Sequence, residues 1–144
     1  MPQLTAYCDV IMGNIWSANS LLGAPLESSL LQSHSDEDYA KHSEITAKYI
    51  QQQFSKCKLI ANTFRFDNGA NGIRYFASLH AQDEQFLSQQ FYADSIIDKV
   101  GSGDCFMAGL IYGLYHQLSP DEIVNFAAAA AFGKLQEKSD ITFQ

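Results

Sequence analysis

Hydrophobic residues occur along the chain in short apolar runs that alternate with longer segments of helical spacing. Residues 9–14 (DVIMGN) and 58–66 (KLIANTFRF) are runs typical of buried strands. Residues 73–79 (IRYFASL) follow two Asn-Gly turn signals, so they are the expected hairpin partner of 58–66. The pattern also predicts short strands at 86–93 (FLSQQFYA) and 95–98 (SIID).

The spacing of apolar residues predicts two helices in the first half of the chain. Residues 16–23 (WSANSLLG) predict one or two helical turns closed by Gly23. Residues 35–54 predict a longer helix, because Ser35 and Asp38 have the spacing of a capping box. Its apolar side chains recur near the helical period at Tyr39, Ile50 and Phe54.

A further helix is expected from Asp104 to about His116. No charged residue follows Asp104 within it, so we expect this helix to be covered on every side. Gly109 and Gly113 are four residues apart, and therefore leave a groove in which another element can pack closely.

The last helix begins at Ser119, which has Pro120 at the first helical position and Glu122 in place for a capping box. Strands and helices in alternation, with one hairpin, predict an α/β layered sheet. No repeat or linker divides the chain, so we expect residues 1–144 to form a single domain. A sheet this small would leave an apolar edge unpaired, which indicates a partial domain.

The composition of the chain argues against membrane-spanning, secreted and nucleic-acid-binding proteins. The chain has 144 residues, 47% of them hydrophobic, and a net charge of -7. We expect no membrane span, because no apolar run approaches about 18 residues, and no signal peptide before the first polar residues. Nine basic residues spread along an acidic chain argue against nucleic-acid binding. Three widely spaced cysteines fit reduced thiols in the cytoplasm, and they are Cys8, Cys57 and Cys105.

The segment DKVGSGD (98–104) places glycines directly before a helix. A helix N-terminus has unpaired backbone N–H groups and a partial positive charge, so it attracts anions. Gly101, Ser102 and Gly103 are therefore expected to hold a phosphate. Asp104 would repel that phosphate, unless it accepts a proton from a hydroxyl that attacks the phosphorus. The alternative is a plain helix start, in which Asp104 only complements the helix dipole.

Other motifs are absent from the sequence. A dinucleotide fingerprint would need glycine at Phe106, and the chain has neither a P-loop nor a Gly-x-Ser-x-Gly elbow. The four histidines show no metal-ligand spacing and are expected to be isolated side chains on the surface; they are His34, His42, His80 and His116. Because the dinucleotide fingerprint is missing, a nicotinamide-dependent oxidoreductase is the least favoured of the functions considered.

The segment IIDKVGSGDCFMAGLIYGL (96–114) resembles the signature of the ribokinase-like sugar kinases, the phosphofructokinase B family. In that family Asp-x-x-Gly-x-Gly-Asp leads into a central helix. The resemblance covers the whole chain, and implies the nucleotide-binding, C-terminal half of a three-layer α/β/α sandwich. The segments DKVGSGD, LIYGL and the terminal SDIT are most similar to the 2-keto-3-deoxygluconate kinases.

The resemblance implies roles for the residues of this signature. Asp104 would be the catalytic base, and the N–H groups of Gly101, Ser102 and Gly103 would hold the transferring phosphoryl group. Asp98 would lie beside the triphosphate and, as in many relatives, near a monovalent cation. A phosphate contact from the neighbouring lysine, Lys99, is a weaker expectation.

The chain departs from the family pattern at two places. Asn14 matches the first residue of an Asn-x-x-Glu element that organises Mg²⁺, but Ser17 stands where Glu is usual, so the metal ligands stay unknown. Asn19 and Glu27 are the candidates to replace that Glu. The usual Thr-x-Gly after the nucleotide strand is also missing, and Arg65 there is either a phosphate contact or simply solvated.

The last helix resembles the Ala-rich wall of the family's adenine site. Contacts with adenine are therefore expected at Phe132, Gly133 and Leu135, with ordinary core packing as the alternative for each. The favoured function is an ATP- and Mg²⁺-dependent kinase of a small sugar or sugar acid, and we expect these 144 residues alone to be inactive. The alternative is a nucleotide-binding module without catalysis. The oligomeric state stays open, a homo-oligomer included.

Overall fold

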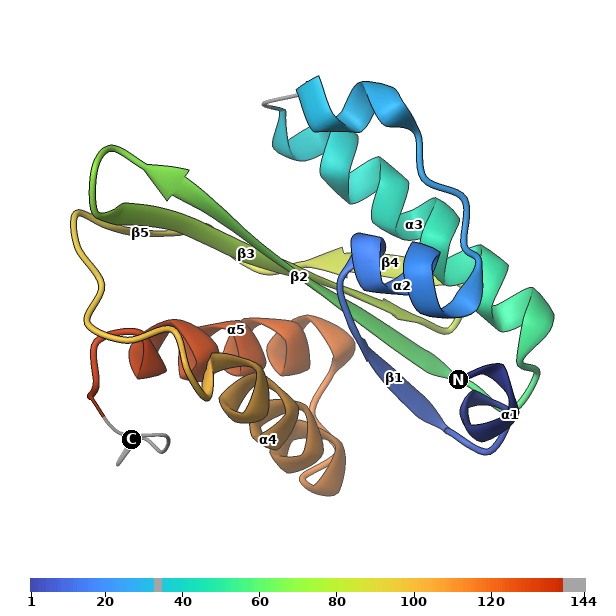
Figure 1. The fold of residues 1–144 in the computed structure, drawn as a ribbon. Helices are drawn as coiled ribbons and strands as arrows, with labels where there is room; N and C mark the ends of the chain where they lie inside the picture. Colours follow the sequence, from blue (N-terminus) through green and yellow to red (C-terminus); the bar gives the residue numbers. More distant parts are fainter. Residues whose placement is uncertain (33–34, 139–144) are drawn as a thin grey trace. The chain divides into compact units, whose positions relative to one another are not determined.

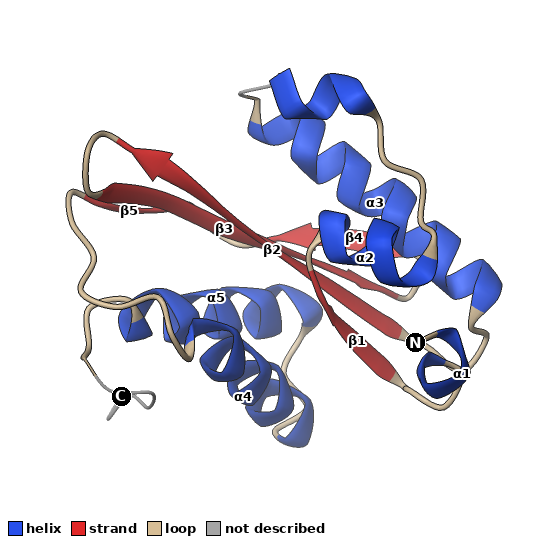
Figure 2. Cartoon of the chain, viewed as in Figure 1, coloured by secondary structure: helices blue, strands red, loops and turns tan. Residues whose placement is uncertain are grey.

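The computed structural model describes residues 1–32 and 35–138 (Figures 1 and 2). The chain forms two compact units. The first contains residues 1–62 and 78–85, and the second contains 63–77 and the residues from 86 onward. The expected α/β class is confirmed, because helices alternate with the strands of one mixed sheet.

The first unit contains a parallel strand pair. Strand β1 (Val10–Gly13) pairs with the start of β2 (Leu59–Asn68), in a register that runs from Val10 opposite Leu59 to Gly13 opposite Asn62. Parallel neighbours need a crossover connection, which the intervening helices supply. The strands predicted at 9–14 and 58–66 are thereby confirmed.

One helix of the first unit ends at the residue that its local sequence predicts. A short helix α1 (Pro2–Thr5) precedes β1, and a 3₁₀ turn (Ser28–Gln32) follows α2 (Ile15–Leu22). Gly23 ends α2 in the left-handed conformation, with φ 75°, as predicted.

The long helix α3 (Asp36–Gln53) agrees with the predicted range. Ser35 is its N-cap residue, but the Ser35 side chain makes no capping hydrogen bond, so the predicted capping box does not form. The three acids of the first turn instead complement the helix dipole. The buried face of α3 lies in an apolar cluster with β2, made of Ala18, Ala24, Ala47, Ile50, Phe54, Cys57 and Ile60.

The second unit contains the tip of a hairpin. Strand β3 (Gly72–Ala81) follows β2 after a turn in which Gly69 has φ 72°, as the Asn-Gly signals predicted. Phe64 and Phe76 stack with ring centroids 4.7 Å apart. Strand β5 (Phe91–Ala93) pairs antiparallel with β3.

The single strand predicted at 86–93 is wrong. The structure has two strands there, β4 (Glu84–Leu87) and β5, with Ser88 between them. The Ser88 hydroxyl accepts a hydrogen bond from the Ala77 N–H at 2.9 Å, and the Ser88 N–H donates to the Ala77 carbonyl at 2.9 Å. A side chain that enters the strand ladder in this way interrupts the strand.

Helices α4 (Ser102–Tyr115) and α5 (Pro120–Lys134) lie side by side (Figure 1). A Cβ atom at Gly109 would lie 2.6 Å from the Ala127 Cα, and one at Gly113 would lie 2.8 Å from a side-chain carbon of Ile123. The groove predicted at these glycines is confirmed, and α5 occupies it. The capping box at the start of α5, Ser119 with Glu122, is also confirmed.

Two expectations near α4 are wrong. Residues 95–98 form no strand, because the N–H groups of Ile97 and Asp98 both donate to the Leu135 carbonyl, at 2.8 and 3.4 Å. Helix α4 is not covered on every side either. Ile111 is 60% exposed and Tyr115 is 81% exposed in this chain.

In the described part of the chain, no helix is both long enough and apolar enough to cross a membrane. The cysteines are free thiols: Cys57 and Cys105 are buried, and Cys8 is half-buried. Burial raises the pKa of Cys57 to about 11. The expectation of surface histidines is wrong for His42 and His80, which are each 2% exposed, whereas His116 is exposed. The terminal SDIT segment and His34 lie outside the described residues.

Candidate functional site

The turn that leads into α4 is held by its own hydrogen bonds. The Val100 N–H donates to Oδ1 of Asp98 at 3.0 Å, and the Ser102 hydroxyl donates to the Lys99 carbonyl at 3.2 Å. Gly101 is the N-cap residue and has φ 80°. Residues with a side chain rarely adopt this conformation, so the turn requires glycine there.

The first backbone N–H groups of α4 are available to a ligand. No hydrogen bond from the amides of Ser102, Gly103 or Asp104 to another described residue is present, as expected for the first turn of a helix. These donors lie at the positive end of the helix dipole. The turn can therefore hold a phosphate-sized anion.

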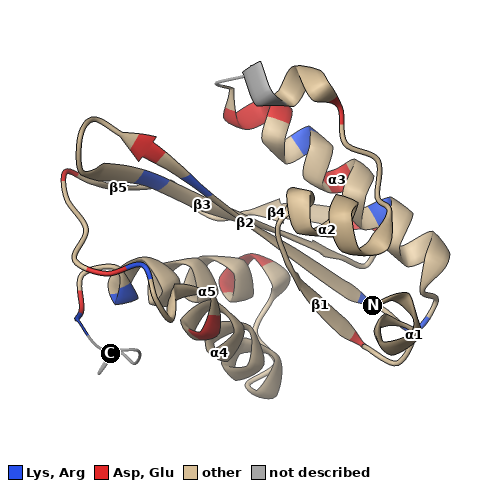
Figure 3. Cartoon of the chain, in the orientation of Figure 1, with Lys and Arg blue, Asp and Glu red and all other residues tan. Residues whose placement is uncertain are grey.

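Asp104 lies in this same first turn and is the only acidic residue there. It is exposed, and its carboxylate has no hydrogen-bond partner among the described residues. The rest of α4, from Cys105 to Tyr115, contains no charged residue (Figure 3). The anion-binding amides and a free carboxylate thus share one helical turn.

A cavity of about 270 Å³ lies against the start of the turn. Lys99 lines it from the turn itself, and Asp67 and Asn71 line it from the hairpin between β2 and β3. The remaining lining residues are Ala70, Gly72, Ile73, Ser95 and Ile96. Sequence reasoning missed the hairpin residues, although the length of the NTFRFDNGANG segment was a signal of an enlarged loop.

The adenine-side residues expected on α5 do not line this cavity. Phe132 is half-buried and stacks on Phe91 with ring centroids 5.0 Å apart, and Gly133 is half-buried beside it. Leu135 is fully buried, so its side chain packs in the core, which was the alternative to a contact with adenine. Arg65 is exposed on β2 and is not among the lining residues.

Asn14 belongs to the first unit, whereas the turn belongs to the second. The Asn14 side chain caps α2, because its Oδ1 accepts the Ser17 N–H at 2.8 Å. Asn19 has a structural partner too, since its Nδ2 donates to the Ala24 carbonyl at 2.7 Å. Among the described residues, no group of three or more His, Cys, Asp or Glu side chains is placed to hold a metal ion.

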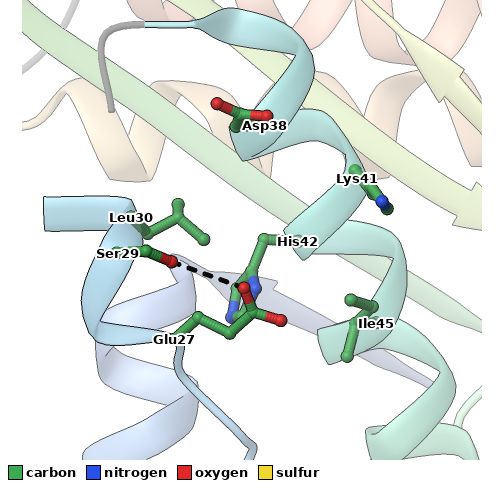
Figure 4. A pocket seen from close by; sticks show the side chains of 7 residues that line it. All are labelled: Glu27, Ser29, Leu30, Asp38, Lys41, His42 and Ile45. Atoms are coloured by element: carbon green, nitrogen blue, oxygen red, sulfur yellow. Dashed lines mark hydrogen bonds between the residues drawn. The ribbon is translucent and has the colours of Figure 1, made fainter. Parts of the chain in front are cut away.

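Glu27 lies in a separate cavity of about 190 Å³ in the first unit (Figure 4). Its carboxylate accepts a hydrogen bond from Ser29 at 3.5 Å, and His42 lies at the back of the cavity. The His42 Nε2 is 3.0 Å from the Pro25 carbonyl, so this ring holds the connecting segment onto α3. Asp38, Lys41 and Ile45 of α3 and Leu30 complete the lining.

Comparison with known proteins gives a consistent result. The whole chain, residues 1–144, matches the model of a family described as pfkB family carbohydrate kinase. No curated protein sequence matches the chain significantly. Among solved structures, 2-dehydro-3-deoxygluconokinase from Thermotoga maritima has a TM-score of 0.84 and 25% sequence identity. That match covers 99% of this chain and 40% of the Thermotoga chain.

Two further structures are similar in fold. A PfkB family carbohydrate kinase from Listeria grayi has a TM-score of 0.78 and 24% identity, over 97% of this chain and 39% of that one. The adenosine kinase of Sinorhizobium meliloti has a TM-score of 0.63 and 17% identity, over 99% of this chain and 36% of that one. The chain therefore spans about 40% of the length of the first of these structures.

Proposed function

Because the chain belongs to the pfkB family of carbohydrate kinases, we propose that it is the nucleotide-binding part of an ATP-dependent sugar kinase. One observation carries the proposal. The unpaired amides of Ser102 and Gly103 and the free carboxylate of Asp104 lie in the same first turn of α4. An anion site and a proton acceptor are two of the elements that phosphoryl transfer requires.

The turn binds the phosphates of ATP through backbone donors. Charge on the transferring phosphoryl oxygens is stabilised by N–H groups that are already oriented, so little reorganisation is needed. Gly101 lets the backbone approach the phosphate closely, because it has no Cβ and already has φ 80°. Lys99, which lines the adjacent cavity, adds a positive charge beside the turn.

Asp104 acts on the acceptor. It takes the proton of a sugar hydroxyl while the hydroxyl oxygen bonds to the γ-phosphorus and the bond from that phosphorus to the β–γ bridging oxygen breaks. The products are the phosphorylated sugar, ADP and a proton carried by the Asp104 carboxyl. An exposed carboxylate without a partner is free to meet a second substrate.

Mg²⁺ fits the carboxylates that this turn provides. The ion is usually held by one or two carboxylates together with phosphate oxygens and water, so a cage of three acidic side chains is not required. Asp98, at the start of the turn, is the residue that would hold it together with phosphate oxygens and water, which leaves Asp104 free to act as the proton acceptor. When bound, Mg²⁺ neutralises charge on the phosphates. A monovalent cation beside Asp98 belongs to the same proposal.

We take 2-keto-3-deoxygluconate as the acceptor, in line with the resemblance and with the named activity of the Thermotoga maritima enzyme. A structure of this chain with the sugar would not test this choice, because the chain spans about 40% of that enzyme. Assays therefore need the remaining part of the fold. Transfer by the completed enzyme to other sugars, but not to this acid, would reject the choice.

The second candidate function is a nucleotide-binding module without catalysis. It is favoured by Ser17, which replaces the family's Glu, and by the use of Asn14 as a helix cap. Calorimetry with ATP and an assay of phosphoryl transfer together separate the candidates. ATP binding without transfer in the completed enzyme would favour the module.

ATP binding by the turn is tested with Gly101→Ala. A Cβ at φ 80° strains the turn, so we expect ATP affinity to fall about tenfold or more. Gly23→Ala is the matched control, because Gly23 has φ 75° but lies in the first unit. Equal ATP affinity in Gly101→Ala and wild type would reject the proposed anion site.

A further inference from the structure

Three side chains in the interior of the first unit carry polar atoms that no described residue satisfies. Thr46 of α3 is fully buried, His80 of β3 is 2% exposed and Asn62 of β2 is 3% exposed. The unpaired atoms are Oγ1 of Thr46, Nδ2 of Asn62 and both ring nitrogens of His80. None of these residues takes part in the proposed phosphoryl transfer.

The three side chains belong to the layer between α3 and the strands that it covers. Ile60 packs with Ala47 of α3, and Asn62 lies on the same face of β2 because side chains alternate along a strand. His80 lies on β3, the strand next to β2 in the sheet, and is buried there; burial lowers the pKa of its ring, and Glu44 and Lys48 of α3 are among the charges that act on it.

These four buried atoms need hydrogen-bond partners. Buried polar groups in folded proteins are almost always hydrogen-bonded to protein or to ordered water, because an unmade bond is costly. The neighbouring Gln85 shows the usual situation, since its Nε2 donates to the Ala40 carbonyl and to the Ser43 hydroxyl, each at 2.8 Å.

The donors and acceptors among these four atoms indicate which kind of molecule can bind to them. Burial lowers the pKa of His80, so its ring is neutral and presents one N–H donor and one lone pair. The Asn62 Nδ2 donates only, and the Thr46 hydroxyl both donates and accepts. A metal ion does not suit the two N–H donors, and an anion does not suit the imidazole lone pair. Water both donates and accepts.

We propose that an internal hydration site lies between α3 and strands β2 and β3, with water bound to Thr46, Asn62 and His80. At least two molecules are required, because the two nitrogens of an imidazole ring point in diverging directions and cannot share one water. Such water is part of the folded structure, as buried waters in globular proteins generally are. It fixes α3 to its strands through polar contacts as well as apolar ones.

The first test compares two substitutions at Thr46. Thr46→Val keeps the shape of the side chain and removes its hydroxyl, so loss of a water-mediated bond should raise the unfolding equilibrium constant roughly three- to tenfold. Ser43→Ala, which removes a hydroxyl with partners in the structure, gives the scale for losing protein-to-protein hydrogen bonds. A Val variant as stable as wild type or more stable overturns the site, because an unsatisfied hydroxyl gains from replacement by methyl.

The second test needs no variant. Magnetisation-transfer NMR of the wild-type chain at pH 7.5 should show cross-peaks between the His80 ring protons and water of long residence time. The exposed ring of His116 is the control, and should show only rapidly exchanging water. Absence of the His80 cross-peaks overturns the site, whatever the stability of the Val variant.

Discussion

The Val100 N–H donates to the Asp98 carboxylate at 3.0 Å, within the turn that begins the candidate site. This bond closes a local loop in which a side chain takes the place of a backbone acceptor, as Asx turns do. The turn therefore holds its shape through a residue that the family resemblance assigned to ligand binding. Asp98 has a structural role in addition to any contact with nucleotide or cation.

Asp98→Ala should destabilise the chain by about 1 kcal/mol and weaken ATP binding, because the Val100 N–H loses its acceptor and the turn loosens. Asp98→Asn is the matched control, since its amide oxygen can still accept that bond. Urea unfolding and ATP calorimetry measure the two effects. An Ala variant with wild-type stability would show that the bond contributes nothing.

Gly109→Ala should destabilise the second unit by about 1–3 kcal/mol, because the new Cβ would lie 2.6 Å from the Ala127 Cα and would force α4 and α5 apart. Gly13→Ala is the control, because a Cβ there meets no atom within 4 Å. Thermal unfolding followed by circular dichroism compares the two. Equal melting temperatures would contradict the close helix contact.

Ser119→Ala should cost about 0.5–2 kcal/mol of stability, because it removes the side-chain half of the capping box of α5. Ser119→Thr keeps the hydroxyl and should retain most of that stability. Hydrogen bonds from Ser119 also lower the pKa of Glu122, so the capping box weakens as Glu122 is protonated in acid. Denaturant unfolding at neutral pH is the measurement.

Stability should fall below about pH 6.5 through His80. Burial lowers the pKa of His80 in the folded chain, with Glu44, Lys48 and Asp83 as the charged neighbours. The unfolded chain then binds a proton at higher pH than the folded chain, so the free energy of unfolding decreases as pH falls from about 6.5 toward the folded pKa.

A pH series of urea unfolding tests this dependence. His80→Gln should flatten the curve between pH 7.5 and 5, whereas His116→Gln, at an exposed position, should leave its slope unchanged. A His80→Gln curve that runs parallel to the wild-type curve would contradict the role of His80.

The sequence predicted best where structure depends on neighbours in the chain. The start of α5 followed from Ser119, Pro120 and Glu122, and the hairpin followed from its Asn-Gly turns. Residues 95–98 were mistaken for a strand, because their hydrogen-bond acceptor is the distant Leu135 carbonyl and no local pattern reveals it.

Within the candidate site, the sequence predicted the glycine turn before α4 but not the cavity beside it. The glycine turn before α4 followed from the sequence, and Gly101 is its N-cap residue with φ 80°. The binding of an anion there stays a prediction. The cavity lined by Lys99, Asp67 and Asn71 depends on how the hairpin folds back, which spacing alone does not determine. Burial of α4 was overestimated, because the absence of charged residues predicts an apolar helix but does not determine what packs against it, and Ile111 and Tyr115 are exposed.

The proposed phosphoryl transfer depends most directly on Asp104. The decisive measurement is phosphoryl transfer from ATP to 2-keto-3-deoxygluconate by the completed enzyme carrying Asp104→Asn, with ATP affinity determined in parallel. Loss of a general base should lower kcat by about 10²–10⁴-fold, while ATP still binds to the amides of Ser102 and Gly103. Turnover close to that of the wild type would contradict the role of Asp104 as the proton acceptor.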